Sequence, residues 1–133
     1  MIVFVCDRNS TLSPMAEAIG GHIAPNIDFQ SAGTTQTSIH VRVHSTLREN
    51  KISGFVLTSK TMWSLDFENV QYVISLVSPE DTPKIPSRYK IRYWMLPDPI
   101  WDPIEEQEDS FRALYEELER RISIFLRAEN IDF

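Results

Sequence analysis

The sequence predicts an α/β fold in which helices cover both faces of a parallel sheet. Short apolar runs, rich in β-branched residues, alternate along the 133 residues with segments of helical spacing, which is the pattern of strand–helix–strand units. A chain of this length supports one core, so we expect a single domain over residues 1–133. Ligands of such sheets bind outside the carboxyl ends of the strands, and a site is therefore expected there.

The first strand and helix enclose the loop that is richest in reactive and polar residues. Residues 2–5 are continuously apolar, as expected of a strand buried on both faces. Ser13 and Pro14 then predict an N-cap followed by proline at the first helical position, and the helix should end near Pro25.

The middle of the chain predicts a second strand and a second helix. Residues 27–30 read as a short strand, closed by the polar turn Ser31-Ala32-Gly33-Thr34. The four-residue spacing of Ile39, Val43 and Leu47 predicts an amphipathic helix that ends near Gly54.

Two more strands and a long helix complete the predicted order. Residues 72–77 form an apolar run, and residues 89–96 alternate between two faces. Asp102, Pro103 and Glu105 match an N-cap, a proline at the first position and an early acid. One apolar stripe follows at helical spacing: Phe111, Leu114, Tyr115, Leu118, Ile122, Phe125 and Leu126.

Reactive or polar residues follow each predicted strand: Cys6, Ser31, Ser78 and Asp98. Because the carboxyl ends of parallel strands share one edge, these side chains should converge. The loop after Cys6 leads into a helix N-terminus, where unpaired N–H groups and the helix dipole favour an anion. We therefore expect Cys6 to have a lowered pKa, with hydroxyl groups of Ser10, Thr11 and Ser13 around it and Asn9 in a left-handed conformation.

Composition narrows the classes of partner. The net charge of −6 argues against nucleic acid, and no apolar run approaches the roughly 20 residues that span a bilayer. The apolar N-terminus is too short for a signal peptide. A single cysteine cannot form an internal disulfide, which fits a reducing compartment. Together with the absence of a membrane span and a signal peptide, it predicts a cytoplasmic protein. His22, His40 and His44 lack metal-binding spacing, so no metal is expected.

Residues 6–17 resemble the signature of the low-molecular-weight protein tyrosine phosphatases and the related thioredoxin-coupled arsenate reductases, Cys-x-Gly-Asn-x-Cys-Arg-Ser-Pro-Met-Ala-Glu. The matching residues are Cys6, Asn9, Ser13, Pro14, Met15, Ala16 and Glu17. The resemblance continues at residues 31–34 and at Leu96-Pro97-Asp98-Pro99, whose Asp-Pro pair carries the general acid in the family.

This resemblance implies a three-layer sandwich on a four-stranded parallel sheet and phosphomonoester hydrolysis without metal or cofactor. Cys6 would be the nucleophile, Ser13 would stabilise its thiolate, and Asp98 would be the general acid. Asp102 is accounted for as a helix cap, and Trp101 could wall a substrate pocket. The phosphate-binding loop would consist of Asp7, Arg8, Asn9, Ser10, Thr11, Leu12 and Ser13.

The resemblance fails at the arginine that the family has six positions after the cysteine, where this chain has Leu12. A guanidinium there would bind two phosphoryl oxygens. Losing such an arginine can lower a phosphoryl-transfer rate by about 10³–10⁵. Arg8 replaces the family's glycine and could supply the missing charge, or it could add backbone strain. Leu57 stands where the family often has a histidine.

Three functions remain open from sequence. The first is a weak or atypical phosphatase, acting on a phosphate-bearing substrate or phosphoprotein. The second is an inactive pseudophosphatase that binds phosphate or a phosphoprotein. The third is cysteine phosphotransfer, as in the IIB components of lactose/cellobiose-type sugar transport, whose loops need no arginine. Arsenate reduction is disfavoured because its disulfide relay needs further cysteines. The sequence leaves the oligomeric state open.

Overall fold

Four parallel strands form the centre of the computed structural model, which describes residues 1–133. They are β1 (Ile2–Cys6), β2 (Phe29–Gly33), β3 (Tyr72–Ser75) and β4 (Ile91–Tyr93). Their order across the sheet is β2-β1-β3-β4, and every neighbouring pair is parallel. The predicted four-stranded parallel sheet is thus confirmed, with β1 at its centre and Cys6 at the carboxyl end of β1.

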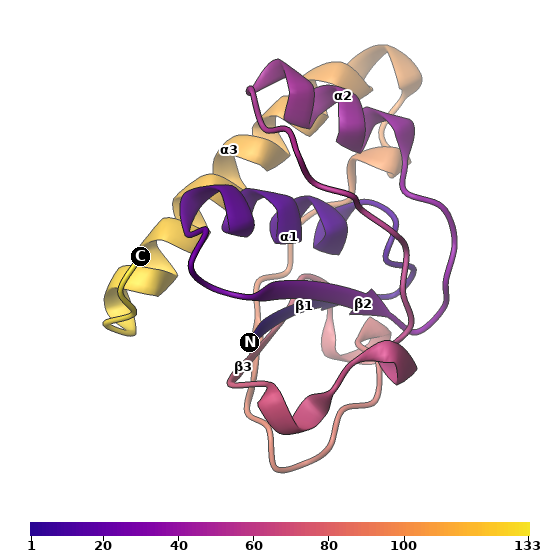
Figure 1. Ribbon diagram of the computed structural model, residues 1–133. Helices are drawn as coiled ribbons and strands as arrows, with labels where there is room; N and C mark the ends of the chain where they lie inside the picture. Colours follow the sequence, from indigo (N-terminus) through magenta and orange to yellow (C-terminus); the bar gives the residue numbers. More distant parts are fainter.

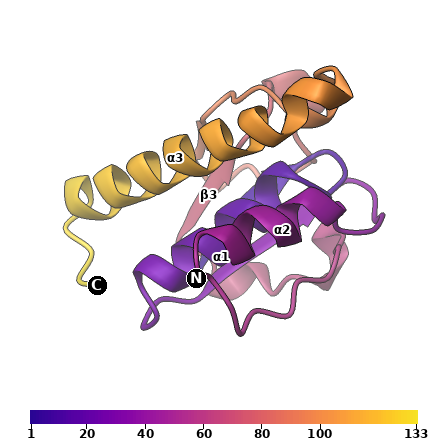
Figure 2. The ribbon, with the colours of Figure 1, turned by 90° about the horizontal axis from the view of Figure 1, so that it is seen from above.

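The α-helices gather on one face of the sheet (Figures 1 and 2). Helix α1 (Leu12–Ile23) packs on the sheet beside α3 (Ile104–Ala128), and α2 (Val41–Glu49) packs against both helices. Ile2 and Phe4 of β1 point into the core that these helices close. This side holds the larger of the two hydrophobic clusters, with 21 buried residues.

The opposite face is covered by loops and short 3-10 helices (Figure 1). Here η1 (Met62–Ser64) and η2 (Phe67–Asn69) lie over a cluster of six buried residues, which includes Val3 and Val5 of β1. The molecule therefore has three layers as predicted, but one outer layer consists of 3-10 helices and extended chain. Two further 3-10 helices, η3 (Pro79–Asp81) and η4 (Pro99–Trp101), follow β3 and β4.

The apolar stripe of α3 is confirmed in full, since all seven of its predicted residues are buried. Residues at this spacing share one side of a helix, so they enter the core together. No helix combines the length and the hydrophobicity needed to cross a membrane.

Several boundaries differ from the sequence prediction. Strand β2 begins two residues later than expected, because Ile27 N donates to Ala24 O in a turn, and it continues through Gly33. Helix α2 stops at Glu49, and Lys51 follows with a φ of 60°. Strand β4 covers only three of the eight residues predicted for it. Its neighbour Trp94 turns toward the cluster under the helices.

One of the three histidines caps a helix, and the other two are exposed. The ring of His40 accepts a hydrogen bond from Arg42 N at 3.1 Å and so caps α2, while it stacks on Phe111 of α3. His22 and His44 are exposed. The expectation that all three are structural or exposed agrees with these positions.

Candidate functional site

Cys6 ends β1 with its side chain almost fully buried, at 3% exposure. Its Sγ lies 2.8 Å from Ser13 Oγ, and Asn9 N donates to Sγ at 3.3 Å. The loop therefore curls around the sulfur, as expected of a loop that runs from a strand end into a helix. Cys6 and Ser13 are brought together as predicted.

The start of α1 corrects one prediction. The helix begins at Leu12, and its N-cap position is Thr11, with no side-chain cap. Ser13 is thus inside the first turn. Its hydroxyl contacts the side chains of Cys6 and Asn9, whereas the hydroxyl of an N-cap serine would accept a hydrogen bond from a backbone N–H. The buried Oγ1 of Thr11 has no hydrogen-bond partner in the protein.

Asn9 organises the loop. Its φ of 51° confirms the predicted left-handed conformation. The side-chain amide donates to Ser13 Oγ at 2.9 Å and to Ser31 Oγ at 3.0 Å, while Oδ1 accepts from Lys60 N at 2.7 Å. The whole residue is buried, and every polar atom of this amide is satisfied, as buried polar groups require.

A second ring of contacts supports Asn9 from outside. Ser31 donates to Glu17 Oε1 at 2.8 Å, and Glu17 pairs with Lys60 Nζ at 3.1 Å. Sequence reasoning did not assign either charged residue a place in this support. Their separation of 43 positions in the sequence hides the pair. Leu57 itself packs on the core under the helices.

The loop approaches β2 so closely that only glycine fits opposite it. A Cβ on Gly33 would lie 2.8 Å from Asn9 N and 2.8 Å from Asp7 O, well inside van der Waals contact. This close approach explains the glycine of the Ser-Ala-Gly-Thr stretch. Arg8 has no positive φ, so its replacement of the family's glycine adds no backbone strain of that kind.

The expected lowering of the pKa of Cys6 is wrong. Burial of the thiol raises its pKa above the ordinary value of 9.0, and the nearby Asp7 carboxylate adds to this effect. Hydrogen bonds from Ser13 and Asn9 act in the opposite direction but do not outweigh burial. Loop N–H groups favour a thiolate, but removal of the sulfur from water disfavours it more.

Leu12 is buried at 2% exposure and belongs to the core cluster under the helices. It also lines a cavity of about 350 Å³ at the carboxyl edge of the sheet, together with Asp7, Asp98 and Trp101. The position expected to carry a guanidinium therefore presents a hydrocarbon surface to this cavity.

Asp98, predicted as the general acid, is a helix cap in the structure, whereas Asp102, predicted as a helix cap, is not. Asp98 Oδ1 accepts from Ile100 N at 3.1 Å and caps η4. The N-cap position of α3 is Pro103, with no side-chain cap, so Asp102 does not cap it. Burial raises the pKa of the half-buried Asp98 above 3.8, the Ile100 N–H opposes this, and the Asp7 carboxylate raises it further.

Arg8 packs against Trp101. The carbon at the centre of its guanidinium lies 5.4 Å from the centroid of the Trp101 ring, within the range of a cation–π contact. This contact joins the loop after β1 to η4. The positive charge lies close enough to Asp98 to oppose the rise of its pKa, as does His40.

The charged groups that line the cavity beside the loop are all carboxylates. Asp7, Asp81 and Asp98 line it, and no arginine or lysine does. Ser78, the residue after β3 that was expected to converge here, lines it as well and donates to Asp81 at 3.2 Å. Cys6, Ser10 and Ser13 are not in its wall. Ser10 instead donates to Ser38 O at 2.8 Å.

The loop nevertheless keeps free donors. The N–H groups of Ser10, Thr11 and Leu12 donate to no acceptor in the protein, since they precede the first helical hydrogen bonds. Unpaired N–H groups at a helix N-terminus attract anions. The site thus combines a neutral thiol and free backbone donors with an acidic rim.

Comparison with known proteins places the chain in a family. The family model described as "Low molecular weight phosphotyrosine protein phosphatase" matches residues 1–132. The sequence matches no curated protein at a significant level.

Solved structures share the fold. An arsenate reductase from Archaeoglobus fulgidus superimposes with a TM-score of 0.79 at 20% identity, covering 95% of this chain and 98% of that one. A low molecular weight protein tyrosine phosphatase from Streptococcus pyogenes gives 0.75 at 23% identity, covering 96% and 91%. The tyrosine phosphatase AmsI of Erwinia amylovora gives 0.76 at 20%, with the same coverage of 96% and 91%.

Proposed function

The chain belongs to the low molecular weight phosphotyrosine protein phosphatase family, and on that premise we propose that it is a phosphatase of low activity, in which Cys6 forms a phosphocysteine. The observation that carries the proposal is the hydrogen-bonded unit of Cys6, Ser13 and Asn9 with free backbone N–H groups beside it. A core residue would need neither the hydroxyl at 2.8 Å from its sulfur nor the open donors.

The proposed reaction has two steps. The Cys6 thiolate attacks phosphorus, the P–O bond to the leaving group breaks, and Asp98 gives its proton to the departing oxygen. Asp98 then takes a proton from a water molecule, which attacks phosphorus and releases inorganic phosphate and the thiolate. The raised pKa of Asp98 suits an acid that must hold its proton at the start.

Low activity follows from three features. The arginine position of the family signature offers no guanidinium to the transferring group, because Leu12 fills it. The productive form also needs an ionised Cys6, and a thiol with a pKa above 9.0 is ionised in about one molecule in a hundred or fewer at pH 7. The carboxylates of Asp7 and Asp81 oppose binding of a phosphate dianion.

The substrate class we propose is a phosphomonoester, free or on a protein. Arsenate reductases share the fold, but a relay through disulfides needs more than the single cysteine present. A thiol nucleophile must stay reduced, which supports the cytoplasm as its compartment.

A pseudophosphatase is the second candidate, and the burial of Cys6 in its neutral form favours it. In that case the loop N–H groups bind the phosphate of a ligand or phosphoprotein without turnover.

Hydrolysis of p-nitrophenyl phosphate across a pH range, beside the variant Cys6→Ser, tests the proposal. We expect slow turnover that the Cys6→Ser variant lacks, with no net rise between the pKa of Asp98 and that of Cys6, because loss of the Asp98 proton offsets the ionisation of Cys6. Phosphate binding seen by calorimetry, with rates equal in wild type and Cys6→Ser, would establish the pseudophosphatase instead.

A further inference from the structure

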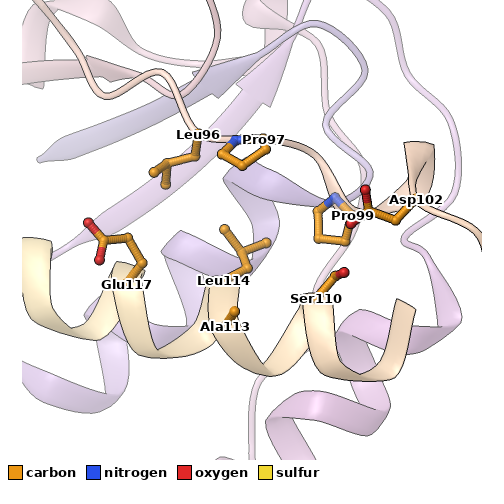
Figure 3. Close-up of a pocket in the computed structure, with 8 residues that line it drawn as sticks. All are labelled: Leu96, Pro97, Pro99, Asp102, Ser110, Ala113, Leu114 and Glu117. Carbon is orange, nitrogen blue, oxygen red and sulfur yellow. The ribbon is translucent and has the colours of Figure 1, made fainter. Parts of the chain in front are cut away.

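A second cavity, of about 370 Å³, lies between α3 and the segment that carries Asp98. We call it the α3 cavity. Figure 3 shows Leu96 and Pro97 of that segment facing Leu114 of the helix, with Glu117 and Asp102 at opposite ends. The volume lies within the range of small-molecule sites, about 300–1,000 Å³.

The polar groups of this cavity accept hydrogen bonds but offer none. Ser110 already uses its hydroxyl proton to donate to Glu106 O at 3.1 Å, so its lone pairs remain. The Leu96 N–H is bonded to Leu76 O, the Asp102 N–H is bonded to Pro99 O, and prolines have no N–H. A ligand that fits these walls must bring its own donors.

The charge of the cavity selects a cation. Hydrogen bonds from Arg120 and Arg121 lower the pKa of Glu117 to about 2 and compensate its charge. Asp102 takes part in none of the seven ion pairs of the structure. The carboxylate of Asp102 is thus the one charge in the wall without an ion-pair partner, in a protein whose net charge is −6.

We propose that the α3 cavity binds an organic ammonium ion with an apolar body, an aryl- or alkylamine, whose ammonium group donates to Asp102 and Ser110. The hydrocarbon part lies against Leu96, Pro97 and Leu114. A charge-assisted hydrogen bond to the carboxylate supplies the selectivity for a cation over a neutral molecule of the same shape.

Occupancy of the α3 cavity is coupled to the candidate active site through a shared wall. Leu96 and Pro97 line both this cavity and the one that contains Asp98. Asp98 stands between Pro97 and Pro99, which both belong to the wall of the α3 cavity. A bound amine therefore restrains the segment that positions the acid. This coupling rests on the proposed function, whereas the binding itself does not.

The test uses three probes of one shape: 3-phenylpropylamine, 3-phenylpropanol and 3-phenylpropionate. Binding is followed by NMR on the methyl groups of Ala113 and Leu114. We expect saturable binding of the amine, with an affinity at least about tenfold above that of the alcohol and above that of the carboxylate. Equal affinity for all three probes, or no saturable shift, overturns the proposal.

Three variants identify the site. Asp102→Asn should weaken the amine about tenfold, and Ala113→Leu, which enlarges a side chain in the wall, should weaken all probes. Glu116→Gln removes an exposed acid of α3 that lies outside the cavity, and it should leave affinity unchanged. An equal loss in Asp102→Asn and Glu116→Gln would show attraction to the general negative charge of α3, and would overturn the site.

The coupling has its own readout. The indole N–H signal of Trp101, which lies in the neighbouring cavity, should shift with the same midpoint as the methyl signals. The rate of Cys6-dependent hydrolysis should change at least twofold at saturation. A stationary indole signal and an unchanged rate overturn the coupling. If the protein without amine shows no hydrolysis, the proposed function is wrong. The NMR titrations with the three probes would still decide whether the α3 cavity binds an amine.

Discussion

At the scale of single residues, two side chains decide what the loop can do. Cys6 has hydrogen-bond partners suited to a thiolate, but burial holds it neutral. Leu12 occupies the arginine position of the family signature and is buried in the core. The first feature sets the pH at which chemistry can occur, and the second sets how well the transition state is stabilised.

Cys6 should react slowly with iodoacetamide at pH 7, because only the thiolate is nucleophilic. As it is the one cysteine in the chain, alkylation reports on this residue alone. We expect the rate to rise about tenfold per pH unit through pH 9, since the pKa lies above 9.0. The urea-unfolded chain is the control, and its rate should reach half of its maximum near pH 8.5 and then level off. A plateau below pH 7 in the folded protein would contradict the expectation.

The same pKa predicts how stability depends on pH. Above about pH 9 the unfolded chain loses the thiol proton before the folded protein does, because burial raises the folded pKa. The free energy of unfolding should therefore fall as pH rises through this range. Urea titrations of wild type and Cys6→Ser at pH 8 and pH 10 measure the effect, and the variant should lack this component of the fall.

Leu12→Arg should raise kcat/KM for an aryl phosphate by at least about 10², the effect of one donor to a developing oxyanion. The position lines the cavity that holds Asp98, so a guanidinium there has a path to a bound phosphoryl group. Leu12→Gln is the matched control, because it adds a polar side chain without charge. Urea midpoints must show that both variants are folded. A folded Leu12→Arg without gain would mean that more than the arginine is missing.

At the scale of elements, the loop is held by α1, β2 and the segment before η1. Asn9 joins Ser13 of α1 to Ser31 of β2 and to Lys60. The ion pair between Glu17 and Lys60 closes this arrangement, with side-chain exposures of 14% and 21%. Such half-buried pairs matter mainly when one partner is removed.

Lys60→Met should lower the free energy of unfolding by about 1–3 kcal/mol, because it leaves the Glu17 carboxylate with Ser31 as its remaining partner. Glu17→Gln added to Lys60→Met should recover part of the loss, since it removes the unpaired charge. Lys90→Met, at an exposed lysine outside all ion pairs, should change stability by less than about 0.5 kcal/mol. Urea unfolding measures all three. Equal effects at Lys60 and Lys90 would show that the pair does not support the loop.

Elements with a regular apolar pattern could be predicted from sequence, and those set by side-chain hydrogen bonds could not. The runs at residues 2–5 and along α3 gave correct elements, because burial follows directly from spacing. Ser13 looked like a helix cap, but Cys6 and Asn9 take its hydroxyl. The sequence motif did predict that Cys6, Asn9 and Ser13 lie together in the loop after the first strand. The raised pKa of Cys6 was not, since desolvation depends on packing from distant segments.

At the scale of the whole molecule, the two faces of the sheet are protected unequally. The helix side holds a cluster of 21 buried residues, and the side under η1 and η2 holds six. Local opening is easiest where few apolar groups are buried.

Amide hydrogen exchange should therefore be faster at residues 55–69 and 79–88 than at β1, α1 and the apolar stripe of α3. We expect protection factors at least about 10² lower on the side of the sheet under η1 and η2, because that side can open while the helix side stays folded. Exchange followed by NMR or mass spectrometry measures this. Uniform protection across both faces would mean that the molecule opens only as one unit.

The burial of Leu12 also sets a stability cost for any substitution that places an arginine at this position. A buried leucine contributes roughly 1.5–3 kcal/mol, out of a total stability that is typically about 5–15 kcal/mol. Replacement of Leu12 by arginine would remove that contribution from a side chain with 2% exposure. In a protein near the lower end of that stability range, other stabilising substitutions would be needed before an arginine could be carried at this position.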